Sequence, residues 1–188
     1  VNSEMSLTSK WLYSNKLQNY NVAADLIAPA NMARGMAVRN GKMLFINRNN
    51  KRIEVVNGAT GVRETPIDLA SNLFTYLGRN KANTADSIWS GVGTLQYNDI
   101  KVDNAGNVLI SNLYEASLTS HLQRFQVWKI NLTDGTGTVI VDDYLNRILP
   151  NATASTLRFD AFGVYGDVNT SAIIMAANRS EERRVGIE

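Results

Sequence analysis

The sequence predicts an all-β protein, because one short pattern of strand, tight turn and strand occurs three times along it. The copies lie about 60 residues apart, and the chain between them lacks the apolar spacing of an amphipathic helix. The three copies are Arg34–Val38 leading to Met43–Asn47, Asn98–Val102 leading to Val108–Asn112, and Asp160–Val164 leading to Ala172–Asn178. Hairpins repeated at such a spacing are typical of the blades of a β-propeller.

The first blade is predicted over residues 33–69. An inner strand at Gly35–Val38 is followed by Asn40-Gly41, the two-residue signal for a type I′ hairpin turn. The chain then returns and turns twice more, which gives four strands, the number that a propeller blade requires. The remaining predicted strands are Lys42–Asn47, Arg52–Val56 and Thr65–Leu69.

The second blade is predicted over residues 97–142, and a partial third blade over residues 158–178. Two insertions, at 71–93 and 114–123, interrupt the repeat. Loops of this length are usually functional, or they form short helices that cap one face. The strands expected in the second blade are Tyr97–Asp103, Asn107–Leu113, Arg124–Asn131 and Thr136–Asp142.

We expect the repeated apolar positions of the inner strands to form the core between face-to-face sheets. These positions are Met36, Val38, Ile100, Val102, Phe162 and Val164. Alternation of apolar residues along a strand indicates that one face of the strand is buried.

The two ends of the chain predict an incomplete propeller domain over residues 1–179. The segment Ser9–Ser14 precedes the first blade at the spacing of an outer fourth strand, which in closed propellers completes the last blade. Residues 180–188 are mostly charged and resemble the translation of a sequencing adapter, so we expect them to be a non-native tail that belongs to no blade.

Composition excludes several classes of partner. The net charge is only +2 and basic residues are scattered, so no basic stripe for nucleic acid is present. No stretch approaches the roughly 20 apolar residues of a membrane span. The chain contains no cysteine, which rules out disulfides, a thiol nucleophile and thiolate metal sites. We expect no cofactor and no metal.

Polar residues recur at one end of the predicted inner strands, at Arg34, Asn98 and Asp160. In a propeller these positions would ring the central channel, where ligands commonly bind. Alternatively, the side chains satisfy backbone groups or pair with one another. Asparagines at 47, 112 and 178 end the second strand of each copy, and a role in turns is favoured for them because asparagine bonds to nearby backbone.

Trp89 is the candidate for sugar binding. It lies in the first insertion among small polar residues, and an exposed tryptophan in such a loop could stack on a sugar ring. Packing between blades is the alternative for each tryptophan of the chain.

Signals for catalysis are weak. The sole histidine, His121, has no neighbouring carboxylate in the sequence, and Asp142-Asp143 with Asp134 lack the spacing of a calcium loop. An enzymatic alternative remains, in which Asp99 and Asp160 on neighbouring inner strands supply acid and base in a hydrolase or lyase acting on polysaccharide.

The scaffold motifs resemble an uncharacterised family of exported lipoproteins from gut-dwelling Gram-negative bacteria, the domain of unknown function 4623. The motifs are Arg34–Val38, Gly41-Lys42, Asn47-Arg48, Ile53–Val56 and Ala59–Gly61, followed by Asn98–Ile100, Val102-Asp103, Gly106–Val108 and Asn112-Leu113. The similarity covers about Leu7 to Asn178 and implies a propeller and export to the periplasm or cell surface. Asn49–Val55 is also similar to the repeat of NHL propellers, which share that fold.

Taken together, these patterns favour a propeller module that binds a glycan or another protein through its loop face or channel, without catalysis. Propellers hold many loops on a rigid ring, which suits recognition. The ligand candidates are Trp89, Arg34, Asn98, Asp99 and Asp160.

Overall fold

The structure is a computed structural model that describes residues 33–48, 50–79, 86–90, 97–115, 124–144 and 158–178. Within these ranges every regular element is a strand, and the strands form four antiparallel sheets. The prediction of an all-β fold is therefore confirmed. Ser9–Ser14, His121 and the tail 180–188 lie outside the described residues.

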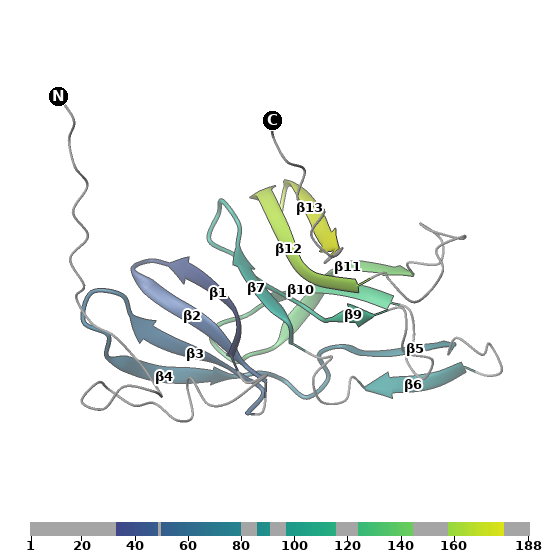
Figure 1. Ribbon diagram of the computed structural model, residues 1–188, viewed down its shortest axis with the longest axis horizontal. Helices are drawn as coiled ribbons and strands as arrows, with labels where there is room; N and C mark the ends of the chain where they lie inside the picture. Colours follow the sequence, from purple (N-terminus) through teal and green to yellow (C-terminus); the bar gives the residue numbers. More distant parts are fainter. Residues whose placement is uncertain are drawn as a thin grey trace, which may run out of the picture.

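The first sheet is a four-stranded meander in the order β1-β2-β3-β4 (Figure 1). Asn40 and Gly41 join the first two strands with positive φ angles of 49° and 73°, as a type I′ turn requires. The predicted turn and meander are thus confirmed. The strands are β1 (Ala33–Arg39), β2 (Lys42–Asn47), β3 (Arg52–Asn57) and β4 (Arg63–Asp68).

The second sheet is also a four-stranded antiparallel meander, in the order β11-β10-β8-β7. Its strands are β7 (Asp99–Val102), β8 (Val108–Ser111), β10 (Arg124–Ile130) and β11 (Gly137–Tyr144). The short strand β9 (Tyr114–Glu115) follows β8 in the chain but pairs with the third sheet. The predicted second meander is confirmed, and the second insertion begins by crossing to the neighbouring sheet.

The third sheet contains the hairpin of β12 (Arg158–Asp167) and β13 (Ser171–Asn178), with β9 on the other side of β12. A fourth sheet is the hairpin of β5 (Thr75–Arg79) and β6 (Asp86–Ser90). This hairpin lies in the first insertion, where short helices were one expectation. Its segments are rich in β-branched and aromatic residues, which favours strands.

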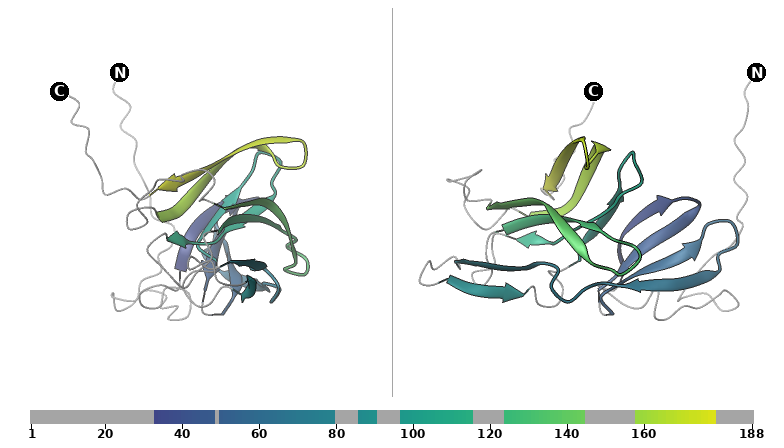
Figure 2. Two further views of the ribbon diagram at one scale, coloured as in Figure 1. Left: turned by 90° about the vertical axis from the view of Figure 1, so that its right-hand side faces the viewer. Right: turned by 180° about the vertical axis from the view of Figure 1, so that it is seen from behind.

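The first three sheets stack in succession, and β7 contacts β1 on one side and β12 on the other (Figure 1). Figure 2 shows the same succession from two further sides. Two apolar clusters hold the stack together. The first joins Ala37, Leu44, Ile46, Ile53 and Val55 to Ile100, Val108, Ile110 and Ile130; the second joins Leu109, Phe125 and Val127 to Phe162. The predicted face-to-face packing of the first two sheets is confirmed.

Part of the predicted core is wrong. Met36 is 54% exposed and Val38 is 62% exposed, whereas Ala37 between them is buried against the second sheet. Successive side chains of a strand point to opposite faces, so the face that carries Met36 and Val38 is turned away from the second sheet. Ile100 and Phe162 are buried as expected. Val102 and Val164 are partly buried, each packed against one of the two clusters.

The three strands β1, β12 and β7, which the sequence predicted as inner strands, share an irregularity near their start. The register shifts between Arg34 and Met36 in β1 and between Phe159 and Ala161 in β12. Before β7, the Asn98 N–H donates to the carbonyl of Ser111, which is also the register partner of Asp99. Each inner strand therefore carries a β-bulge or a similar break at the end where the polar candidates lie.

Gly35 occupies the bulge of β1 with φ of +61°. A β carbon at this position would lie 2.7 Å from Asp99 Oδ1 and 2.7 Å from the Ile100 nitrogen. Glycine is therefore required twice, by the backbone conformation and by the close approach of β1 to β7.

Candidate functional site

Asn98 connects the second sheet to the first through a hydrogen bond with Arg48. The Arg48 side chain is buried just after β2; its Nε donates to the Tyr97 carbonyl at 2.9 Å and its Nη2 to Asn98 Oδ1 at 2.7 Å. Asn98 is only 2% exposed. Its placement favours the structural alternative, in which the side chain satisfies neighbouring groups.

Asp99 joins the second sheet to the third. Its Oδ2 accepts a hydrogen bond from the Phe162 N–H at 3.1 Å, across to β12. Its Oδ1 accepts from the Ile100 N–H at 2.9 Å and from Lys101 Nζ at 2.8 Å. The residue is 4% exposed, so its carboxylate is occupied within the protein.

The other three candidates are placed by their backbone alone. Arg34 lies on β1, Asp160 on β12 and Trp89 on β6, where its register partner is Tyr76. The side chains of these three candidates lie outside the described part of the structure. Their ligand-binding roles stay predictions.

The predicted turn role of the recurring asparagines is confirmed at Asn47. Its Oδ1 accepts from the Asn50 N–H at 3.1 Å in the turn after β2. Its Nδ2 also donates to Glu54, at 2.9 Å. The buried Glu54 carboxylate further accepts from Arg52 at 2.6 Å and from Arg63 at 2.9 Å, so this ionic cluster ties β2, β3 and β4 together.

Two buried aromatic residues, Phe74 and Tyr97, lie between the first and second sheets, at what we call the first interface, and neither was predicted as a core residue. Phe74, from the first insertion, packs edge-on against Tyr97 with ring centroids 5.5 Å apart, and its ring lies 5.9 Å from that of Trp128. Phe74 and Tyr97 have positive φ angles of 59° and 28°, which are strained for residues with large side chains. Burial raises the pKa of Tyr97. The first insertion thus contributes the buried ring of Phe74 to the core, and we call this residue the Phe74 plug.

The structure also reveals a cleft of about 320 Å³ beside β4, between the first sheet and the turn that joins β10 to β11. Its charged rim contains Arg39, Lys42 and Glu64. Lys42 Nζ lies 2.5 Å from Glu64 Oε2, and the hydrogen bond from Lys42 lowers the pKa of Glu64. The apolar lining consists of Leu44, Val55, Ile67 and Leu132.

A second hollow of about 400 Å³ adjoins the first and shares Thr65, Ile67 and Leu132 with it. Its acidic lining residues are Asp68 and Asp134. Hydrogen bonds from Thr136 lower the pKa of Asp134, so this carboxylate is ionised at neutral pH. We call the two hollows together the β4 groove. The first hollow is lined by Arg39 and by the Lys42–Glu64 ion pair, whereas the charged residues that line the second hollow, Asp68 and Asp134, are both acidic.

The β4 groove could not be predicted from the sequence, because its lining comes from β1, β2, β3, β4 and a turn more than sixty residues further along the chain. None of its residues had been a ligand candidate. A long-range contact of this kind leaves no signal in local spacing.

Within the described ranges, no group of three or more histidine, cysteine or acidic side chains could hold a metal ion. The same part of the chain has no helix long and apolar enough to cross a membrane. Comparison with models of protein families gives no match, and comparison with curated proteins gives none either.

Proposed function

We propose that the chain is part of a β-propeller in an exported bacterial protein, and that it binds a peptide segment of a partner protein in the β4 groove. The propeller is supported by three sheets that follow one another with their inner strands β1, β7 and β12 in contact. The recurrence of a backbone irregularity near the start of each inner strand supports it further.

The β4 groove is the observation that carries the binding function. Its volume falls in the range of ligand sites, about 300–1,000 Å³. An apolar floor with Arg39 in the first hollow and two aspartates in the second suits an extended peptide with an apolar side chain between an acidic and a basic group. The acidic group would lie near Arg39, and the basic group near Asp68 and Asp134.

The enzymatic alternative requires an accessible carboxylate on an inner strand. Asp99 is the only one of its two proposed carboxylates whose side chain is described, and it already accepts three hydrogen bonds in a buried position. Removing it from these partners would detach β7 from the Phe162 N–H. The geometry therefore favours binding over acid–base chemistry at this position.

Glycan binding is a second candidate, favoured by one observation. Trp89 and Tyr76 are register partners in the β5–β6 hairpin, so two aromatic residues occupy paired positions. Aromatic rings have an apolar face that can stack on a sugar ring.

A display library of short peptides, selected on the 188-residue protein, tests the main proposal. Thr65 is exposed and lines both hollows, so Thr65→Trp should fill the groove and weaken binding of selected peptides by at least about tenfold, or 1.4 kcal/mol. Thr138→Trp places the same ring on an exposed position of β11 outside the groove and should leave affinity unchanged.

Equal effects of the two tryptophan variants, or a library that yields no binder, would contradict the groove. A glycan array is the second arm of the experiment. Sugar binding that is lost in Trp89→Ala and retained in Thr65→Trp would replace the peptide with a glycan.

A further inference from the structure

Arg39 gives the β4 groove a positive charge that no described carboxylate neutralises. The first hollow has three charged lining residues, and two of them, Lys42 and Glu64, form an ion pair. Among the residues that the structure describes, no aspartate or glutamate forms an ion pair with Arg39. Its Nε donates instead to the backbone carbonyl of Gly106, at 2.7 Å. The first hollow therefore keeps the charge of one guanidinium group.

The hydrogen bond to Gly106 holds the Arg39 side chain from the second sheet. Gly106 lies in the turn between β7 and β8, sixty-seven residues after Arg39. This turn is itself fixed by Asp103, whose carboxylate accepts from the N–H groups of Ala105 and Asn107 at 3.0 and 2.7 Å. A side chain that is already held in place loses less conformational freedom when it binds a ligand.

The donors that remain on Arg39 match the geometry of a carboxylate. Arginine has five N–H donors, and the Gly106 carbonyl accepts from the one on Nε. The terminal nitrogens, Nη1 and Nη2, carry the other four. Two parallel N–H groups of a guanidinium can bind both oxygens of one carboxylate, which a lysine ammonium cannot do. Leu44 and Val55 line the same hollow, so a carboxylate and an apolar group of one ligand can bind there together.

We propose that Arg39 determines the specificity of the β4 groove by binding a carboxylate of the ligand through Nη1 and Nη2, while the β7–β8 turn positions its guanidinium. This inference rests on the proposed binding function of the groove and identifies the chemical group that the first hollow selects. A carboxylate of the partner comes either from an aspartate or glutamate side chain or from the C-terminus of the polypeptide.

Two pairs of small probes test the proposal, because the members of each pair differ only in a carboxylate or an amide. N-acetyl-leucine and N-acetyl-leucinamide represent a C-terminus. Ac-Leu-Glu-NH2 and Ac-Leu-Gln-NH2 represent a side chain. In NMR titrations of the 188-residue protein, we expect the acid of at least one pair to bind about fivefold more tightly than its amide, the upper range for a partly exposed ion pair. The pair that shows this preference identifies the source of the carboxylate.

A second readout in the same titrations is specific to Arg39. Binding of both carboxylate oxygens restricts rotation of the guanidinium group, so the Nη–H signals of Arg39 should sharpen with the acid probe and stay broad with the amide. High salt should reduce the preference for the acid, because salt screens exposed charges. Both measurements use the unmodified protein and so do not depend on the folding of a variant.

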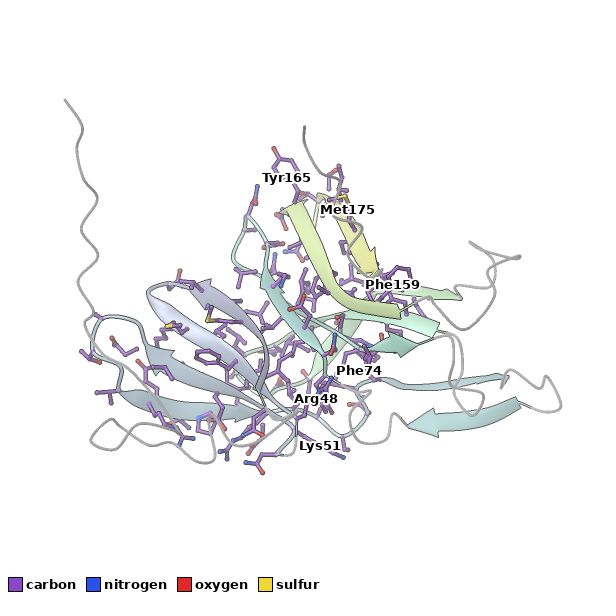
Figure 3. All side chains as sticks on the ribbon, viewed as in Figure 1. Arg48, Lys51, Phe74, Phe159, Tyr165 and Met175 are labelled. Carbon is purple, nitrogen blue, oxygen red and sulfur yellow. The ribbon has the colours of Figure 1, made fainter. Side chains whose placement is uncertain are left out.

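Three variants separate the geometry of Arg39 from its charge. Arg39→Lys keeps the charge but lacks the paired N–H groups, so the preference for the acid should fall below about twofold. Arg39→Gln should abolish the preference. Lys51→Gln is the matched control, because it also removes one positive charge. Lys51 is exposed in the turn between β2 and β3, at the bottom of Figure 3, and this turn is at the opposite end of β2 from Arg39. This variant should keep the preference.

Several outcomes would overturn the inference. Equal binding of acid and amide by the unmodified protein would do so, whereas peptide binding that Thr65→Trp blocks would still support the groove. A preference for the acid that persists in both Arg39 variants would assign the carboxylate to another cation. If none of the four probes binds, the inference is wrong, and the peptide library decides the proposed function separately.

Discussion

The two interfaces of the stack use equivalent strand positions but are held together differently. Between the first and second sheets, a large apolar cluster is reinforced by the Phe74 plug and by Arg48. Between the second and third sheets, the apolar cluster is smaller, and two carboxylates reach across to backbone N–H groups of the third sheet. The first interface therefore relies on a large apolar cluster supplemented by arginine hydrogen bonds from Arg39 and Arg48, whereas the second interface relies more on carboxylates.

Truncation of the Phe74 plug should have the largest effect on the free energy of unfolding. Phe74 is fully buried in the first interface, so Phe74→Ala should lower the free energy of unfolding by about 3–5 kcal/mol through the lost burial and the cavity left behind. Urea unfolding followed by circular dichroism measures this change. The exposed Val62→Ala is the control and should stay within about 0.5 kcal/mol. A similarly small loss in Phe74→Ala would show that the plug does not hold the first interface.

Two glycine variants should give the next largest loss of unfolding free energy. Comparing them measures how much of the loss comes from the close approach of β1 to β7. Gly35 and Gly41 both have positive φ, so alanine at either should cost about 1–2 kcal/mol of backbone energy. Only Gly35→Ala also meets neighbouring atoms, at 2.7 Å, which should add about 1–3 kcal/mol of overpacking. Gly41 has open space around it. Equal losses in the two variants, measured by urea unfolding, would contradict a tight contact at Gly35.

Acidification should affect the second interface first. Burial opposes ionisation of Asp103, but hydrogen bonds from Asn107, Val168 and Ala105 outweigh it, so the pKa of Asp103 lies below its ordinary value. An aspartate in an unfolded chain titrates near about pH 3.9. Since the folded pKa is lower, the stabilisation is fully present above that pH and is lost as the pH falls through the folded pKa.

Hydrogen exchange measures the effect of acid at each interface, after correction for the intrinsic pH dependence of exchange. Amides of β12 and β13 should lose protection at a higher pH than those of β1, which lies outside the Glu54 cluster, because Asp103 accepts from the Val168 N–H at 2.9 Å. Asp103→Asn should weaken the second interface at neutral pH by about 1.5–3 kcal/mol and flatten its acid dependence. Parallel loss of protection at both interfaces would show that the second interface does not rely more on carboxylates than the first.

Local sequence patterns predicted the hairpins well, but they predicted poorly which face of each hairpin packs against the next sheet. Asn40-Gly41 and the alternation around it fixed a turn type and two strands, since these depend on residues close in sequence. Alternation shows that Ala37 and Val38 face opposite sides, but it does not say which side meets the next sheet. For this reason Val38 was expected in the core and is exposed.

Contacts between distant segments account for the rest of what was missed. Nothing near Phe74 in the sequence indicates that its ring packs on Trp128. Asp99 was predicted to contact a ligand, because its actual partner, the Phe162 N–H, is sixty-three residues away and leaves no local signal. The β4 groove likewise forms only after the β10–β11 turn folds against β4. Such pairings depend on the order in which sheets stack.

The succession of sheets has a consequence for synthesis on the ribosome. The first sheet is contiguous from Ala33 to Asp68, so it can form as soon as it emerges, and a hairpin forms within about 1–10 μs. Its apolar face is covered only when Ile110 has been synthesised, because Ile110 belongs to the same cluster. Ile110 lies about forty residues later, and synthesis of these residues takes about 2–8 s. During translation, the most recently formed sheet therefore exposes an apolar face until the next sheet is made. A chaperone could bind this exposed face, and the next sheet would then displace the chaperone.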